Sequence, residues 1–168
     1  MARRVFYSFH YDLDHWRVQQ VVNMGVVDGS PFLTANSWEQ VKLTTGIQKW
    51  IDDQLLGRSC TVVLIGNQTA QRDWVQYEIK KSWNSNKGVV GVYIHNLLNN
   101  QRMAAYKGSN PFERFYVNQT RLSNIVKSYD SPGLTSNDVY AYIKDNLPNW
   151  VDEAIRIRTG YSATTLIS

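Results

Sequence analysis

The sequence predicts an α/β domain, in which a doubly wound parallel sheet of about five strands carries helices on both faces. Two nearly continuous apolar runs, at residues 60–66 and 88–95, are typical of strands buried on both sides. Segments with apolar residues at helical spacing alternate with these runs along the chain. The length of 168 residues and the 43% hydrophobic content suit one compact domain and exclude a disordered chain.

A short strand and a helix open the predicted order. Residues 5–9 are β-branched and aromatic, which favours a strand. Asp12 and Asp14 follow as candidate caps of the next helix. The apolar residues of that helix recur at helical spacing, at Val18, Val21 and Val22.

A long loop, a helix and the expected central strand come next. Residues 25–38 are rich in Gly, Ser, Pro and Asn and hold at most one short edge strand. A helix is then expected to begin at Thr44 or Thr45, and its inward-facing residues are Ile47, Trp50, Ile51 and Leu55. The apolar run at 60–66 is the predicted central strand.

The second half of the chain repeats the alternation of strand and helix. Residues 67–69 offer a cap for a helix over about 71–83, whose apolar stripe is Val75, Ile79 and Trp83. A buried strand is expected at 88–95. Residues 96–124 are polar and irregular, and a loop of this length is either functional or holds a short helix.

The C-terminal part is predicted to add the last strand and a broken helix. The strand is expected at residues 125–129, and Ser136 is expected to cap a helix that Pro148 interrupts before a second segment to about Arg158. We therefore expect one domain over residues 1–168, with a core over 3–130 and a C-terminal helical segment over 135–159.

Composition excludes several classes of protein. The apolar runs fall far short of the roughly 20 residues that cross a bilayer, and the N-terminus lacks the pattern of a secretory signal, so we expect a cytoplasmic protein. One cysteine, Cys60, and three histidines form neither an internal disulfide nor a metal cluster. The net charge of +4 is spread along the chain without a basic stripe, so no nucleic-acid partner is expected.

The predicted topology brings four regions to the carboxyl ends of the strands. They are residues 8–14, the loop before Trp38, residues 66–74 and His95. Taken alone, Asp12 and Asp14 are more typical of helix caps. His10 and His95 are typical of polar residues with satisfied hydrogen bonds, and Cys60 of inert core.

Trp74 and Glu78 form the most specific chemical pattern in these regions. They are four residues apart, so an aromatic ring and a carboxylate share one helical edge. Such a pair could stack an aromatic leaving group and hold negative charge against a cationic sugar during cleavage of an N-glycosidic bond. The plainer interpretation is a solvated helix face on which Glu78 pairs with Lys80 or Lys81, and a Trp74 that only packs.

Several segments, in the same order along the chain, resemble TIR domains, and in particular the TIR-like branch of the bacterial Thoeris anti-phage system. The segments are residues 5–9 with the acidic residues that follow, 38–42, 50–55, 62–66, 72–79 and 91–95. The resemblance extends over residues 5–112 and adds little in the C-terminal third. The loop at 25–38 lacks the Arg-Asp and Pro-Gly pattern of animal TIR domains. In its place it carries the sequence Asp-Gly-Ser-Pro at residues 28–31.

The resemblance implies a flavodoxin-like fold and an enzyme that consumes NAD as substrate, with no cofactor. It implies that Glu78 is the catalytic residue and that Trp74 contacts the substrate; we expect Ser8, Phe9, His10 and Asp12 to complete the binding site. It further implies an anti-phage role, in which a phage-derived trigger leads to a cyclic ADP-ribose isomer that activates an NAD-depleting partner effector. A homo-oligomer is also expected.

A second function is compatible with the same resemblance. The chain would then be a non-enzymatic TIR-like module that recruits partners by self-association, with Glu78 in a structural role.

Overall fold

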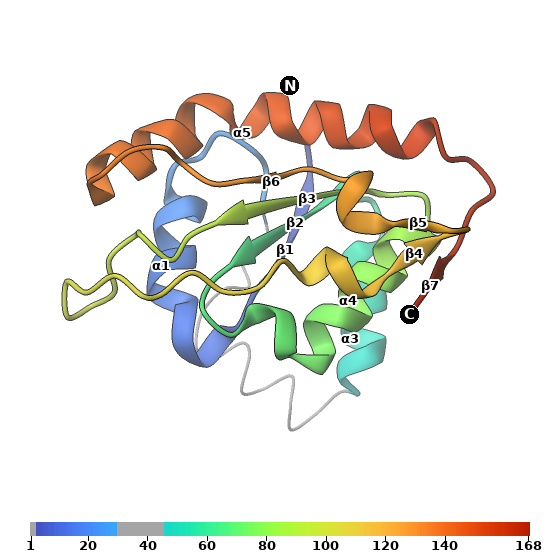
Figure 1. Ribbon diagram of the computed structural model, residues 1–168, viewed down its shortest axis with the longest axis horizontal. Helices are drawn as coiled ribbons and strands as arrows, with labels where there is room; N and C mark the ends of the chain where they lie inside the picture. The colour runs from blue at the N-terminus through green and yellow to red at the C-terminus, as the bar shows by residue number, and fades with distance from the viewer. Residues whose placement is uncertain (1–2, 30–45) are drawn as a thin grey trace.

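The computed structural model describes residues 3–29 and 46–168, and it confirms the α/β class (Figure 1). Within the described residues, four parallel strands form the main sheet in the order β1-β2-β3-β6. They are β1 (Val5–Ser8), β2 (Cys60–Ile65), β3 (Gly88–Tyr93) and β6 (Ser128–Tyr129). Each lies inside the segment that its composition predicts.

The other side of β1 carries a single bridge in the described part of the chain. Arg4 pairs in parallel with Asp28, and the Val5 N–H donates to the Asp28 carbonyl over 2.9 Å. The loop at 25–38, in which an edge strand is expected, is described only to residue 29. The segment at 38–42 and the expected helix start at Thr44 or Thr45 lie outside the described residues.

Helices cover both faces of the sheet, as the sequence predicts (Figure 1). One face carries α1 (Tyr11–Asn23) and α5 (Ser136–Thr159), and the other carries α3 (Ile47–Leu55) and α4 (Asp73–Asn84). Side chains alternate along a strand, so Tyr7 packs toward α1 and α5 whereas Phe6 packs toward α3 and α4. None of the helices in the described ranges is long and apolar enough to cross a bilayer.

α5 runs unbroken through Pro148, so the predicted interruption is wrong. Leu147 and Val151 are fully buried on either side of the proline, and their packing on the sheet outweighs a proline penalty of about 3 kcal/mol. The cap is also one residue earlier than predicted. The Asp138 N–H donates to Thr135 Oγ1 over 3.1 Å, and the two residues form a capping box.

His10 caps α1, in place of the predicted Asp12 or Asp14. The Leu13 N–H donates to His10 Nδ1 over 3.3 Å, and both aspartates lie in the first turn. Negative charge in a first turn still stabilises a helix through its dipole. The acidic pattern therefore marks the start of the helix correctly but not its cap.

Residues 96–110 carry no helix or strand, as expected, whereas residues 111–124 hold short helices and strands. β4 (Tyr116–Val117) pairs antiparallel with β5 (Thr120–Arg121) and with β7 (Leu166–Ile167) near the end of the chain. The short 3-10 helices η2 (Pro111–Arg114) and η3 (Leu122–Asn124) accompany them. Phe112 and Leu122 are fully buried in the core beside α4, so this segment extends the α4 face of the domain.

Candidate active site

Glu78 lies on the face of α4 that packs against the sheet, and only 5% of the residue is exposed. Ser8, the last residue of β1, is fully buried and close enough to affect the Glu78 carboxyl group. Glu78 Oε2 and Ser8 Oγ each lack a hydrogen-bond partner among the described residues. The interpretation of Glu78 as part of a solvated face, paired with Lys80 or Lys81, is therefore wrong.

The surroundings of Glu78 favour its neutral form in the free protein. Burial raises the pKa of Glu78 to about 8, and the nearby Ser8 hydroxyl opposes part of this rise. Among the described residues, no charged side chain contributes to the shift in the pKa. A cationic group placed next to this carboxyl would lower its pKa and favour the carboxylate. The position is therefore suited to a ligand that carries a positive charge.

Further unpartnered polar atoms lie at the carboxyl ends of the strands. In the described ranges, Asp14 Oδ2 and His95 Nδ1 are buried and have no hydrogen-bond partner. The Asp14 carboxyl group packs against Gly66, which directly follows β2. A Cβ added to Gly66 would lie only 2.1 Å from Asp14 Oδ2, so a larger residue would not fit there. His95 follows β3 and is 6% exposed. Because buried polar atoms are usually satisfied, several unsatisfied ones at this end of the sheet indicate a place for a ligand.

The Asp14 carboxylate forms a buried ion pair with Arg17. Asp14 Oδ1 lies 3.0 Å from Arg17 Nη1, and the side chains are only 1% and 4% exposed. Arg17 also donates from Nε to the Leu97 carbonyl over 2.8 Å and from Nη2 to the Met103 carbonyl over 2.9 Å. Burial raises the pKa of Asp14, and Arg17 opposes the rise. The pair fixes α1 to the segment that follows β3.

The loop after β2 forms another wall of this region. The Gly66 N–H donates to Thr69 Oγ1 over 2.8 Å, so Thr69 orders the loop. The prediction that residues 67–69 cap α4 is wrong, because the cap position is Arg72. A Cβ on Gly108 would lie 2.2 Å from the Gly66 carbonyl oxygen, so the two backbones are in close contact. Asn67 Nδ2 also donates to the Tyr106 carbonyl over 3.1 Å. The insertion at 96–124 therefore borders the candidate site.

Trp74 lies in an aromatic cluster between α3 and α4. It packs against Phe6, Ile51 and Leu55, and its ring meets Tyr77 edge-on with 6.1 Å between centroids. It is half-buried and shares the predicted edge of α4 with Glu78, one turn away. The contacts with this cluster show that Trp74 has a packing role, and its contact with a substrate stays a prediction.

The three predicted residues that follow Ser8 lie at the start of α1 or directly before it. Phe9 packs on the α1 face of the sheet, 6.2 Å from Tyr11 between ring centroids. His10 is buried at the cap of α1, where burial lowers its pKa, and Asp12 is exposed. Of the predicted binding residues, Ser8 is therefore the one that the structure places beside the Glu78 carboxyl group.

The predicted topology brings Asp14 and His95 to this edge, but neither was among the predicted binding residues. Asp14 precedes Val18 by four residues and Val21 by seven, so it falls on the buried stripe of α1. An acid at such a position is a signal that the sequence does contain. In the described residues, no three His, Cys, Asp or Glu side chains gather closely enough to hold a metal ion.

Comparisons with known proteins agree with this architecture. The model of the family described as "Thoeris protein ThsB, TIR-like domain" matches residues 6–99, a range that contains α4, β3 and all of β1 except Val5. The chain is 38% identical over 120 residues to a protein of Bacillus cereus (strain MSX-D12) named "Putative cyclic ADP-D-ribose synthase ThsB1". The match covers 67% of this chain and 62% of that protein, so the chain spans less than two thirds of the relative's length.

Proposed function

The chain belongs to the Thoeris ThsB family of TIR-like domains, and on that basis we propose that it cleaves nicotinamide from NAD and forms a cyclic ADP-ribose isomer. One observation carries the proposal. Glu78 is buried next to Ser8, and within the described ranges its Oε2 has no hydrogen-bond partner and no cation affects its pKa, at the end of the sheet where parallel α/β folds bind ligands. The name of the relative as a cyclic ADP-ribose synthase supports the same class of reaction.

The proposed step breaks the bond between the ribose C1′ and the nicotinamide nitrogen. The bonding electron pair moves to the pyridinium ring, so nicotinamide leaves as a neutral molecule and needs no general acid. Positive charge then develops on the ribose, and the Glu78 carboxylate stabilises it electrostatically. One acidic side chain is sufficient for this step because no proton has to be transferred to the leaving group.

The second step decides between a cyclic and a linear product. If an adenine or ribose atom of the same molecule attacks C1′, the ring closes, whereas attack by water yields linear ADP-ribose. Exclusion of water therefore favours the cyclic product. The insertion at 96–124 contacts the loop after β2 and is suited to this role, because Gly108 and Tyr106 close the region beside Gly66 and Asn67.

The wider role that we propose is a signalling one in bacterial anti-phage defence, in the cytoplasm. A phage-derived trigger would activate the enzyme, which would need no cofactor beyond its substrate NAD, and the cyclic product would activate an effector that depletes NAD. Membership of the Thoeris ThsB family supports this role. Self-association belongs to the proposal as a means of completing or covering the site.

Incubation of the purified protein with NAD, with and without an extract of phage-infected cells, tests the proposal. We expect mass spectrometry to detect free nicotinamide together with a product that has the mass of cyclic ADP-ribose. Self-association without nicotinamide release under either condition would contradict the enzymatic proposal and favour the interaction module.

The rate of nicotinamide release is expected to depend on the ionisation of Glu78. Because the pKa of Glu78 is about 8 in the free protein, kcat/KM should rise about tenfold per pH unit below that value and level off above it. Ser8→Ala removes the hydroxyl that favours the carboxylate, so the inflection should move to higher pH. Ser162→Ala, at an exposed position, is the matched control. Identical inflections in the wild type and Ser8→Ala would contradict the role of Ser8.

A further inference from the structure

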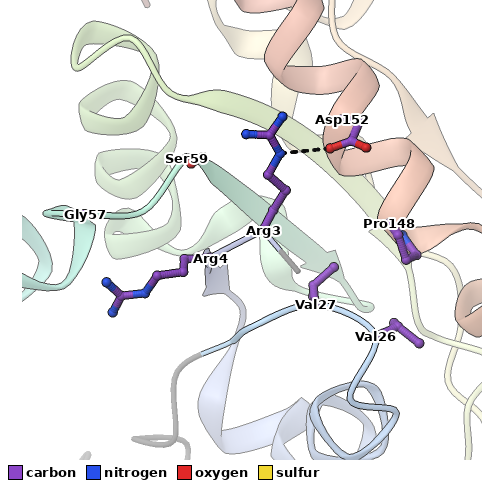
Figure 2. Close-up of a pocket in the computed structure, with 8 residues that line it drawn as sticks. All are labelled: Arg3, Arg4, Val26, Val27, Gly57, Ser59, Pro148 and Asp152. Atoms are coloured by element: carbon purple, nitrogen blue, oxygen red, sulfur yellow. Dashed lines mark hydrogen bonds and ion pairs between the residues drawn. The ribbon is translucent and has the colours of Figure 1, made fainter. Parts of the chain in front are cut away.

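A hollow lies at the amino ends of β1 and β2, at the edge of the sheet opposite to Ser8 and Glu78 (Figure 2). Its volume is about 550 Å³, and its walls come from four segments of the chain. These are residues 3–4, residues 26–27, the pair Gly57 and Ser59, and one edge of α5 at Pro148 and Asp152. The proposed reaction makes no use of this hollow.

Two guanidinium groups flank the hollow with unused donors. Arg3 Nε donates to Asp152 Oδ1 over 3.1 Å, and Figure 2 shows Arg3 turned toward α5 while Arg4 points the other way, toward Gly57. Arg4 Nε lies 3.7 Å from Asp28 Oδ2, too far for a hydrogen bond. Both side chains are more than half exposed, and no further hydrogen bond joins either one to the described residues. Their terminal nitrogens can therefore bind an anion.

A third guanidinium adds positive charge behind this wall. Arg58, between Gly57 and Ser59, is only 7% exposed, and its Nε has no hydrogen-bond partner among the described residues. Burial and the neighbouring Arg4 both lower the pKa of Arg58, so the two cations repel each other. A bound anion would offset this repulsion, and the low-dielectric wall would strengthen the attraction.

The opposite wall is apolar apart from the carboxylate of Asp152. Val26, Val27 and the ring of Pro148 face the hollow, and Pro148 and Asp152 lie one helical turn apart on α5 (Figure 2). The volume lies within the range of about 300–1,000 Å³ that is typical of small-molecule sites and exceeds the need of an inorganic anion. A ligand with a charged end and a planar apolar end would satisfy both walls.

We infer that this hollow binds an organic phosphate of nucleotide size, with its phosphate on Arg3 and Arg4 and its base against Val27 and Pro148. The inference does not depend on the proposed NAD reaction. Calorimetric titration with ADP, adenosine and inorganic phosphate tests it, and none of these probes has a bond to nicotinamide that the enzyme could cleave. We expect ADP to bind at least about tenfold more tightly than either adenosine or phosphate, because only ADP meets both walls.

Two variants with opposite expected effects locate the site. Arg4→Gln should weaken ADP binding about tenfold, and Asp152→Asn should strengthen it by releasing Arg3 Nε and removing a negative charge. Lys49→Gln and Asp53→Asn make the same changes in charge at an exposed pair on α3 and should leave the affinity unchanged. Equal affinities in Arg4→Gln and the wild type, or equal binding of phosphate and ADP, would overturn the inference. If ADP bound only near Glu78, Arg4→Gln and the wild type would have equal affinities, and the inference would be overturned.

Discussion

Glu78→Gln is expected to lower nicotinamide release from NAD by about 100- to 1,000-fold, the usual effect of removing one group that stabilises transition-state charge. Glutamine keeps the shape of the side chain but cannot acquire the negative charge that the cationic ribose requires. Measurement of nicotinamide by mass spectrometry under conditions that activate the wild type is the direct assay. Equal rates for the variant and the wild type would remove Glu78 from the mechanism.

The same substitution should not unfold the protein. Glu78 binds a proton more tightly in the folded protein, with a pKa of about 8, than in the unfolded chain, where the ordinary value is 4.5. The wild type should therefore lose folding free energy as the pH rises from about 4.5 through about 8, by up to several kcal/mol. Glu78→Gln removes this dependence, so above pH 8 its melting temperature should equal or exceed that of the wild type. A variant that is less stable at every pH would indicate a structural role for Glu78.

Arg17→Met is expected to cost about 3–5 kcal/mol of folding free energy, since it leaves a buried carboxylate unpaired. Asp14 would lose its partner at 3.0 Å, and the carbonyls of Leu97 and Met103 would lose their donors. For a chain of this size the melting temperature should fall by roughly 10 °C. Calorimetric melting curves measure this change.

An exposed ion pair provides the control for Arg17→Met. Lys49 and Asp53 also lie 3.0 Å apart, but their side chains are 74% and 53% exposed. Lys49→Met should therefore change the folding free energy by about 0.5 kcal/mol or less. The deficit of Arg17→Met should also shrink as the pH falls and Asp14 becomes neutral. A deficit no larger than that of Lys49→Met would show that the buried pair does not hold α1 to the segment after β3.

The main sheet could be predicted from the sequence because its strands are buried on both faces. The uniform apolar runs of β2 and β3 have no other simple explanation in a chain of this length, and the helices between them follow from their spacing. The unbroken α5 could not be predicted, because local rules give Pro148 a penalty and do not include the burial of Leu147 and Val151. The small sheet of β4 and β5 is completed by β7, more than 40 residues further along the chain.

Part of the candidate site was also predictable. The spacing of Trp74 and Glu78 places them on one edge of α4, and the position of Ser8 follows from the end of β1. Burial of Glu78 was not predictable, because an acid near Lys80 and Lys81 is usually solvated and only packing of α4 on the sheet decides the matter. The ion pair of Asp14 and Arg17 was likewise hidden, because its strength comes from burial rather than from spacing.

The central claim is that Glu78 faces the positive charge of a bound nicotinamide ring, and a titration of Glu78 by carboxyl ¹³C NMR tests it most directly. The pKa should be about 8 in the free protein and should fall when an uncleavable carbocyclic analogue of NAD binds, because the cationic ring favours the carboxylate. NADH, whose nicotinamide ring is neutral, is the matched control ligand, and its binding should not lower the pKa of Glu78. A pKa of Glu78 that is the same with the cationic analogue bound as in the free protein would contradict the claim.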